Sequence, residues 1–307
     1  MARSDAARTL DRFPRAALAR YALTQPELRP FASSFNDIYR VSAVEGEFVL
    51  RVSPRQCVHS AHAAQAEQAW TDRIRSAGLS APTVVGTRDG GLVVTEDGPA
   101  ARRAVILTWI AGKVLEQPFP ADRITSLGEL SARLHQATPP SSTRPAGVLD
   151  ASSPTLFAVP DVLESAPPGH REILRQRSKQ AREWLHELWS SEEEVPRVLH
   201  FDLTPKNVVE MDGEGLAVID CEDLAWGHRA QDIANTIYGI THGEFDAHAI
   251  TMFRTGYERH AAWQDLDDER LRQLFIVRRI GMVNLSLTLR RPGLAEYLDR
   301  HAAALTQ

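Results

Sequence analysis

Three polar residues in the second half of the chain have the types and spacing needed to transfer a phosphoryl group. Asp202 is followed five residues later by Asn207, and Asp220 comes thirteen residues after that. One carboxylate can meet the hydroxyl of an acceptor and accept or orient its proton. An amide oxygen and a second carboxylate are the hard ligands that Mg²⁺ takes together with phosphate oxygens. These residue types are the ones that phosphoryl transfer from a nucleotide requires.

The segment between Asn207 and Asp220 predicts a β-hairpin. Residues 208–211 would run out, the Asp-Gly-Glu-Gly stretch at 212–215 would turn, and residues 216–219 would run back. Equal numbers of residues in both directions would place Asn207 and Asp220 side by side at the open end, with Asp202 on the preceding loop. We therefore predict Asp202 as the catalytic base and Asn207 and Asp220 as Mg²⁺ ligands. Taken singly, each could instead be a loop or strand-end cap.

The composition describes an ordinary globular protein of two lobes or one large domain. Of 307 residues, 43% are hydrophobic and 24% charged. The net charge of −5 argues against a nucleic-acid partner, and no run of eighteen apolar residues predicts a membrane span. Cys57 and Cys221 lack metal spacing and read as free thiols of a reducing compartment. We expect a cytoplasmic protein, and its oligomeric state stays open.

The first third of the chain reads as a small lobe built mainly on an antiparallel sheet. After it, Ala111-Gly112 forms a flexible break. Residues 1–107 would form a nucleotide-binding lobe and 108–112 a hinge. The expected elements are a helix over 5–23, strands over 37–43 and 47–52, a helix over 60–77 ending at Gly78, strands over 83–87 and 91–95 across Asp89-Gly90, and a buried strand over 104–110.

Residues 113–307 read as a larger, mostly helical lobe that would carry the catalytic residues and bind the acceptor. The expected elements are an amphipathic helix over 121–137, a proline-rich irregular excursion over 139–170, a helix over 171–189, the chemistry-bearing stretch 198–223, and helices over most of 232–304. The fold class is thus α+β in two lobes, and nucleotides bind in the cleft that such lobes enclose.

The motifs in this region resemble the aminoglycoside phosphotransferase and choline kinase-like branch of the protein-kinase-like fold, over roughly residues 10–300. That branch usually reads His-Gly-Asp-Leu-His-Pro-x-Asn, then Ile-Asp-Phe/Trp-Glu, then a Gly and Asp-Leu-Ala. The resemblance implies ATP (or GTP) and Mg²⁺ as cofactors and a small-molecule hydroxyl acceptor. The matching residues here are His200-Phe201-Asp202-Leu203-Thr204-Pro205-Lys206-Asn207, Ile219-Asp220-Cys221-Glu222, Gly227, and Asp232-Ile233-Ala234.

Three further residues take supporting roles in this resemblance. His200 would brace the catalytic loop by bonding backbone groups. Asp232, at the start of a helix, would be an N-terminal cap or a loop anchor. Glu222 would touch a second metal or the acceptor, or be a solvated acidic residue next to Asp223.

The resemblance also implies a cation that binds the nucleotide phosphates. Protein kinases use a lysine on the third strand, paired with a helix glutamate, but no lysine precedes Lys113 here. Arg51 takes that position, and a guanidinium can form forked bonds to phosphate or carboxylate. Glu67 lies eleven residues before Gly78, as the pairing glutamate does, so we predict an Arg51–Glu67 ion pair. The alternative is a surface arginine on an edge strand.

Two segments would complete the nucleotide site. Ser33, Asn36 and Tyr39 fit a Ser/Gly-x-x-Asn-x-x-Tyr pattern found where related phosphotransferases cover the phosphates, and the alternative is a plain turn. Backbone groups of Thr108 to Ile110 would pair with the adenine edge, with Ile106 and Ile110 on its faces. That strand could equally be a core strand crossing between the lobes.

Three functions compete. The first is a small-molecule kinase. The second is a protein Ser/Thr kinase, which the roughly eleven residues between Asp220 and Asp232 disfavour as too short a docking segment. The third is a non-catalytic nucleotide-binding regulator.

The acceptor pocket would come from residues 139–170 and the C-terminal helices. A polycationic aminoglycoside would need carboxylates there, such as Asp161, Glu164 or Glu244. The pairs Arg278-Arg279 and Arg290-Arg291 read as solvated faces rather than as contacts to an anionic acceptor.

Overall fold

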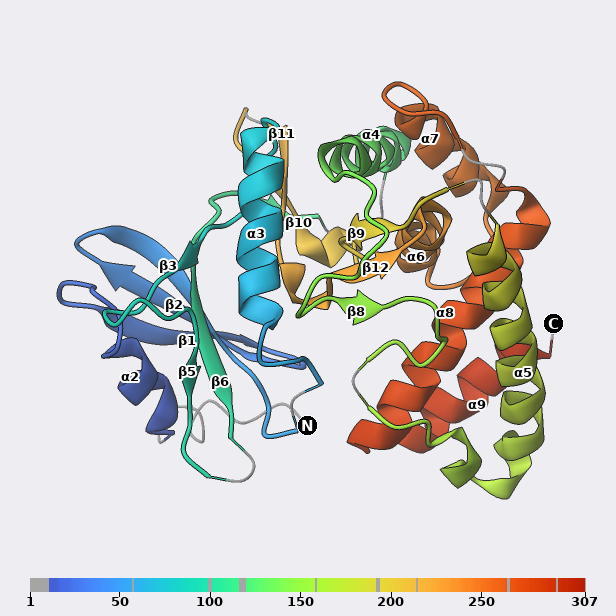
Figure 1. Cartoon of the computed structure of the whole chain (residues 1–307), viewed down its shortest axis with the longest axis horizontal. Coiled ribbons are helices and arrows are strands. Elements are labelled where there is room, and N and C mark those ends of the chain that lie inside the picture. Colours follow the sequence, from blue (N-terminus) through green and yellow to red (C-terminus); the bar gives the residue numbers. More distant parts are fainter. Residues whose placement is uncertain are drawn as a thin grey trace.

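The computed structural model describes residues 11–56, 58–98, 101–115, 120–157, 159–191, 194–213, 215–263, 266–290 and 292–306. A sheet-rich part made by the N-terminal third lies beside a larger helical part (Figure 1). The predicted α+β architecture of a small antiparallel-sheet lobe and a mostly helical lobe is therefore confirmed. The residues outside these ranges include Cys57, Glu192, Glu193, Asp265 and Arg291.

The N-terminal lobe is a six-stranded antiparallel sheet in the order β1-β2-β3-β6-β4, with β5 also paired to β6. Helix α3 crosses one face, between the sheet and the helical part (Figure 1). The elements are α2 (Phe13–Leu18), β1 (Glu27–Ser33), β2 (Asp37–Ala43), β3 (Gly46–Val52), α3 (Ala63–Ser76), β4 (Val84–Val85), β5 (Val94–Thr95) and β6 (Arg103–Thr108).

Side-chain alternation along β3 separates the core of this lobe from the site. Phe48, Leu50 and Val52 are buried in one hydrophobic cluster that also contains Ile106 of β6. Arg51 falls between them in the period of two, so it projects from the opposite face, toward α3. β3 lies between β2 and β6, so Arg51 is on a central strand and the edge-strand alternative is wrong.

Several N-terminal predictions need correction. Among the described residues, the expected helix over 5–23 is reduced to α2, and Tyr21 forms a β-bridge with Thr87. Strand β1 was not predicted, because Pro30 interrupts its pattern; proline is tolerated there since β1 is an edge strand with a bulge between Pro30 and Ala32. The strands expected over 83–87 and 91–95 are shorter, and both pair with β6 rather than with each other.

The C-terminal lobe consists mainly of six long helices around one large hydrophobic cluster, which includes Leu127, Leu203, Ile233 and Phe253. The helix predicted over 121–137 is observed with those bounds. The elements are α4 (Ala121–Ala137), β8 (Leu149–Asp150), α5 (Pro168–Ser190), β9 (Arg197–Leu199), β12 (Ala225–Gly227), α6 (Arg229–Thr241), α7 (Ala247–Tyr257), α8 (Asp268–Leu289) and α9 (Leu294–Leu305).

A second small sheet joins the expected hinge to the predicted hairpin. Its order is β11-β10-β7, with β7 (Lys113–Val114), β10 (Val208–Met211) and β11 (Gly215–Val218) all antiparallel. Gly112 makes this docking possible: its φ is 143°, and a Cβ there would lie 2.2 Å from the Glu210 carbonyl oxygen. The segment between the lobes is thus fastened to the hairpin.

The hairpin register differs from the prediction by one residue. Val208 pairs with Val218 and Met211 with Gly215, so Asn207 faces Ile219, whose amide donates to the Asn207 carbonyl at 2.9 Å. The strand therefore returns one residue earlier than expected, and Asp220 follows at the start of a one-turn 3₁₀ helix, Cys221–Asp223.

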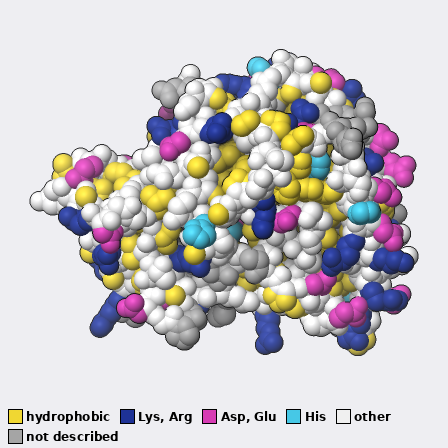
Figure 2. Space-filling model, in the orientation of Figure 1, with side chains coloured by type: hydrophobic (Ala, Val, Ile, Leu, Met, Phe, Trp, Pro, Cys, Tyr) yellow, Lys and Arg dark blue, Asp and Glu magenta, His cyan; other side chains and the backbone are white. Residues whose placement is uncertain are grey.

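Side chains are distributed unevenly over the face seen in Figure 2. Hydrophobic side chains form a band across the middle of this face, and charged side chains are most numerous over the helical part on the right. Among the described residues, none of the helices has the length and apolar character to cross a bilayer.

Candidate active site

A cavity of about 940 Å³ lies between the two lobes. Its wall includes β-strand residues of the N-terminal lobe, the connecting segment, the hairpin and one face of α8. Asp202, Asn207 and Asp220 all line it, so the structure brings together the three residues singled out by type and spacing. The volume suits a nucleotide with room for a further small molecule.

The loop that carries Asp202 is held in an unusual backbone conformation. Phe201 has a φ of 66°, a left-handed value that favours glycine. Its amide donates to Asp232 Oδ1 at 2.6 Å, and its carbonyl accepts from Asn235 Nδ2 at 3.2 Å. The other oxygen of Asp232 bonds His135 Nε2 at 2.8 Å. Asp232 is therefore a loop anchor, whereas the N-cap of α6 is His228.

His200 braces the same loop, as predicted. Its Nε2 lies 3.1 Å from the Ile219 carbonyl oxygen, and its Nδ1 accepts from the Asp202 amide at 3.3 Å. Both contacts are satisfied by one neutral tautomer with the proton on Nε2. The imidazole is buried and links the Asp202 loop to the residue before Asp220.

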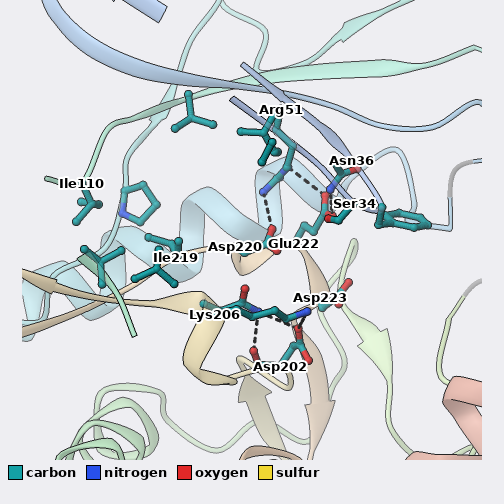
Figure 3. Close-up of a pocket in the computed structure, with 18 of the residues that line it drawn as sticks. Ser34, Asn36, Arg51, Ile110, Asp202, Lys206, Ile219, Asp220, Glu222 and Asp223 are labelled. Carbon is teal, nitrogen blue, oxygen red and sulfur yellow. Dashed lines mark hydrogen bonds and ion pairs between the residues drawn. The ribbon is translucent and has the colours of Figure 1, made fainter. Parts of the chain in front are cut away.

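Both carboxylate oxygens of Asp202 are hydrogen-bonded. Asn207 Nδ2 donates to Oδ2 at 2.8 Å and to the Asp202 carbonyl at 2.8 Å. Arg278 Nη2, from α8, donates to Oδ1 at 2.7 Å. Lys206 Nζ lies 3.6 Å from Oδ2 (Figure 3). These contacts fix the direction of the carboxylate, while each oxygen keeps a lone pair for a further donor.

Asp220 presents its carboxylate to the cavity from a left-handed backbone position with φ 59°. Withdrawal from bulk water, then the neighbouring charge of Glu222, raise the Asp220 pKa to about 7, with Arg51 opposing the rise. The side chain keeps 45% of its surface exposed, so solvent in the cavity moderates that shift. A cation bound beside Asp220 would stabilise its ionised carboxylate.

Arg51 forms the predicted ion pair with Glu67. Nη1 donates to Glu67 Oε1 at 3.0 Å and Nη2 to Oε2 at 2.5 Å, a two-pronged contact between buried side chains. Arg51 Nε also lies 3.1 Å from Glu222 Oε2, and Nη1 lies 3.7 Å from Asp220 Oδ1 (Figure 3). Burial alone would lower the Arg51 pKa, but these carboxylates outweigh it and raise that pKa.

The segment expected to cover the phosphates contributes Asn36 rather than Ser33. Asn36 Nδ2 donates to Glu222 Oε1, and Asn36 Oδ1 is buried without a hydrogen-bond partner among the described residues. Ser33 is absent from the described cavity wall, because its hydroxyl donates to Asp37 at 2.7 Å within the β1–β2 hairpin; Ser34 lines the cavity instead. Glu222 is 13% exposed and paired, so the solvated alternative is wrong.

The connecting segment lines the other end of the cavity. Thr108 and Ile110 are both in the wall, together with Trp109 and Lys113. The Thr108 hydroxyl accepts from the Thr83 amide at 2.9 Å. The expectation that Ile106 covers an adenine face is wrong, because alternation along β6 turns Ile106 into the core of the N-terminal lobe. The apolar side chains of Ile38, Val49, Leu107, Leu115, Val209 and Ile219 line the cavity.

Several polar residues of the cavity wall were missed from the sequence, among them Lys206, Asp223, His59 and Arg278. Lys206 and Asp223 adjoin predicted residues, and proximity in the chain could have indicated them. Burial alone would raise the Asp223 pKa, but the contact of His59 Nε2 with Asp223 Oδ1 at 2.6 Å and the charge of Arg278 contribute to a net lowering of that pKa. Arg278 was missed because the sequence predicts a solvated face there.

The prediction of a solvated face is wrong for both Arg278 and Arg279. Helix α8 directs Arg278 into the cavity, and Arg279 is buried and donates to the Gly243 carbonyl at 3.0 Å.

This two-lobe fold, with acidic residues and an arginine–glutamate pair around an interlobe cavity, defines a protein of the kinase-like class. The sequence profile of the phosphotransferase enzyme family matches residues 27–272. The chain belongs to that family and is a phosphotransferase with an alcohol group as acceptor. No curated protein sequence matches it significantly.

Solved structures share the fold along nearly the whole chain. A microcompartment-associated aminopropanol kinase is 22% identical with a TM-score of 0.71, covering 95% of this chain and 94% of its own. An amicoumacin kinase in complex with AMP-PNP, Ca²⁺ and Ami is 18% identical with a TM-score of 0.72, covering 94% of this chain and 91% of its own. A spectinomycin phosphotransferase bound to ADP and spectinomycin is 14% identical with a TM-score of 0.55, covering 93% and 94%.

Proposed function

We propose that this protein transfers the γ-phosphoryl group of ATP (or GTP) to the hydroxyl of a small molecule, with Mg²⁺ as the metal. The observation that carries the proposal is the convergence of Asp202, Asn207 and Asp220 on one interlobe cavity. The proposal keeps residues 1–107 as the nucleotide-binding lobe, 108–112 as the hinge and 113–307 as the catalytic and acceptor-binding lobe. The cytoplasmic location stays a prediction from the sequence.

Asp202 is the proposed catalytic base. With its oxygens held by Asn207 and Arg278, the carboxylate can accept a hydrogen bond from the acceptor hydroxyl and align that oxygen with the γ-phosphorus. The new bond joins the acceptor oxygen to the γ-phosphorus, and the bond to the β–γ bridging oxygen breaks. The leaving ADP keeps that electron pair, and the hydroxyl proton passes to Asp202 and then to solvent.

The donor set around Asp220 fits a Mg²⁺ ion. Both amide hydrogens of Asn207 face Asp202, which leaves the Asn207 amide oxygen as the group for a cation. Asn207 and Asp220 would hold the ion, and Glu222 stands two residues on. When bound, Mg²⁺ would neutralise charge on the nucleotide phosphates.

The remaining residues of the cavity suit the nucleotide. Arg51, oriented by Glu67, would bind the phosphates, with Asn36 closing over them in place of the expected Ser33. Thr108 and Ile110 would pair with the base through backbone groups, and the apolar wall would cover its faces. The amicoumacin kinase and the spectinomycin phosphotransferase bind AMP-PNP and ADP respectively, which supports an adenine nucleotide.

Two experiments test this function with purified full-length protein. Coupled detection of ADP, with a panel of hydroxyl compounds, should reveal acceptor-dependent turnover. Asp202→Asn should reduce turnover by several orders of magnitude and leave Mg-ATP protection against thermal unfolding in place, because the substitution removes the base and keeps the shape. Unchanged turnover would remove Asp202 from its role. Mg-ATP protection of the unaltered protein without turnover by any acceptor would favour a nucleotide-binding regulator.

A further inference from the structure

One face of α8 forms part of the cavity wall next to Asp202. Arg278, Met282 and Leu285 follow at intervals of four and three residues, so they lie on the same side of the helix, and all three line the cavity. Val58 and Phe157 add further apolar surface to the wall. An acceptor that reaches Asp202 therefore meets the Arg278 guanidinium beside an apolar surface, with the exposed Lys206 ammonium 3.6 Å from Asp202 and the paired His59 and Asp223 in the same wall.

Arg278 has hydrogen-bonding capacity that the protein does not use. A guanidinium carries five N–H donors, and only the one on Nη2 that meets Asp202 Oδ1 has a partner among the described residues. The side chain is 11% exposed, so the other donors are largely withdrawn from bulk water. Such a group favours an anionic partner, above all one with two oxygens.

The carboxylates on this side of the cavity are already neutralised. Asp202 accepts from Arg278 and Asn207, and Asp223 pairs with His59. Asp161, Glu164 and Glu244, which a polycationic acceptor could have used, are absent from the described cavity wall, and Asp161 pairs with Arg182 at 2.6 Å instead. The described wall thus offers a polycation no unpaired negative charge beyond the proposed metal site.

We propose that the acceptor is a hydroxyl compound that carries a carboxylate, and that Arg278 binds this carboxylate while Asp202 meets the hydroxyl. The inference rests on the phosphotransferase function and adds the substrate class. The hydroxyl, Asp202, Arg278 and the carboxylate form a chain of hydrogen bonds of roughly 2.7–3 Å each. The two groups of the acceptor must therefore lie within roughly 10 Å of each other, with an apolar body between them against Met282 and Leu285.

Acceptors matched in everything but charge test the proposal. One set is hydroxypropionate, aminopropanol and propanol, each with a terminal hydroxyl. A second set with an aromatic body is hydroxymethylbenzoate, hydroxymethylbenzylamine and benzyl alcohol. Hydroxyethylphosphonate, which has the same two methylenes between hydroxyl and acid group as hydroxypropionate, separates a carboxylate site from a general anion site. Turnover with Mg-ATP is followed as ADP release by the full chain, and kcat/KM of each charged member is divided by that of its neutral partner.

The ratio is the informative quantity because Arg278 also touches Asp202. An effect that acts through Asp202 changes all members of a set alike and cancels in the ratio. We expect the carboxylate to be favoured by about ten- to a hundredfold, the contribution of one charge-assisted hydrogen bond. Arg278→Met should bring the ratio close to one, and Arg278→Lys should keep part of it. Arg272→Met removes a charge from the same helix outside the described cavity wall and should leave the ratio unchanged.

Several outcomes would overturn the proposal. Three of them concern the acceptors: a higher kcat/KM for the ammonium or neutral member, a higher kcat/KM for the phosphonate than for the carboxylate, or no turnover of either carboxylate. The fourth is an Arg278→Met variant that slows every member of a set equally. Turnover of the ammonium series alone would reject the substrate class and leave the phosphotransferase function standing. Failure of Mg-ATP to protect the protein against thermal unfolding would reject the function itself.

Discussion

At the scale of single residues, Arg51 stands where the resemblance places a lysine, and its contacts explain how an arginine can serve there. A lysine ammonium is a single point of charge, whereas the Arg51 fork bonds both oxygens of Glu67 and leaves Nε for Glu222. The guanidinium thereby orients two acidic residues from different lobes. The two groups are buried, so losing one bond is costly.

Arg51→Lys should destabilise the protein by about 1.5–3 kcal/mol, because one charge-assisted hydrogen bond to buried Glu67 is lost. It should also raise KM for ATP. Urea unfolding and nucleotide titration of the initial rate measure the two effects. The matched control is Arg40→Lys, because Arg40 pairs with Glu47 on the same face of the sheet but both side chains are exposed; it should change stability by less than about 1 kcal/mol. Equal losses in both variants would contradict the assignment.

Backbone strain and side-chain burial oppose each other at Phe201. Its left-handed backbone costs about 1–2 kcal/mol relative to glycine, and related proteins have glycine at this place in the motif. Its ring, however, is buried in a cluster with Leu199 and Leu285. Burial of an aromatic side chain stabilises by about 3–5 kcal/mol. Because burial stabilises by more than the strain costs, this chain can carry a phenylalanine in a strained position.

Strain and burial together predict an unusual order of stability. Phe201→Gly loses the ring but relieves the backbone strain, whereas Phe201→Ala loses the ring and keeps the strain. Phe201→Gly should therefore be more stable than Phe201→Ala by about 1 kcal/mol, and both should be less stable than the unaltered protein. Urea unfolding of the three proteins gives the order. An alanine variant more stable than the glycine variant would show that the left-handed conformation is not maintained.

At the scale of elements, the site depends on how β7 docks against β10. The pairs Val114–Val209 and Lys113–Glu210 tie the segment that lines the base end of the cavity to the hairpin that begins after Asn207. The connecting segment and the two proposed metal ligands, which flank the hairpin, are thus joined through one small sheet. A disturbance at the junction should change both ends of the site together.

Gly112→Ala tests this coupling. The new Cβ would lie 2.2 Å from the Glu210 carbonyl oxygen, so β7 must move away from β10. We expect a weaker affinity for Mg-ATP and a loss of stability of more than about 1 kcal/mol. Gly46→Ala is the matched control, because Gly46 has a similar φ of 135° and nothing within 4 Å of the added Cβ. Calorimetric nucleotide binding should separate the variants, and equal affinities would argue against the coupling.

Local patterns predicted the elements more successfully than the contacts between them. The amphipathic period over 121–137 and the alternation over 37–43 and 47–52 depend on neighbouring residues, and α4, β2 and β3 follow them. Arg278 reaches Asp202 only because α8 packs across the lobe, a contact over 76 residues that carries no local pattern. The hairpin register was wrong by one residue because the turn length, not the strand pattern, sets it.

At the scale of the whole molecule, the packing of α9 against α5 and α8 partly buries a histidine, His301, beside two positive charges. His301 stacks on Tyr297 at a centroid distance of 4.0 Å, and its Nδ1 lies 3.4 Å from Arg279 Nη1. Burial first, then the charges of Arg279 and Arg300, lower the His301 pKa from 6.5 to about 4. The folded protein therefore holds this imidazole neutral in mildly acidic solution.

This arrangement predicts a loss of stability in acid. Between pH 6.5 and about 4 the unfolded chain binds a proton at His301 and the folded protein does not, so the free energy of unfolding falls as the pH falls through this window. His301→Gln removes that proton, so its stability should fall less over the same window. His248→Gln, on the exposed surface of α7, is the control and should retain the original slope. Urea midpoints at several pH values measure the slopes. A His301→Gln slope equal to that of the unaltered protein would show that the C-terminal helix does not hold this histidine neutral.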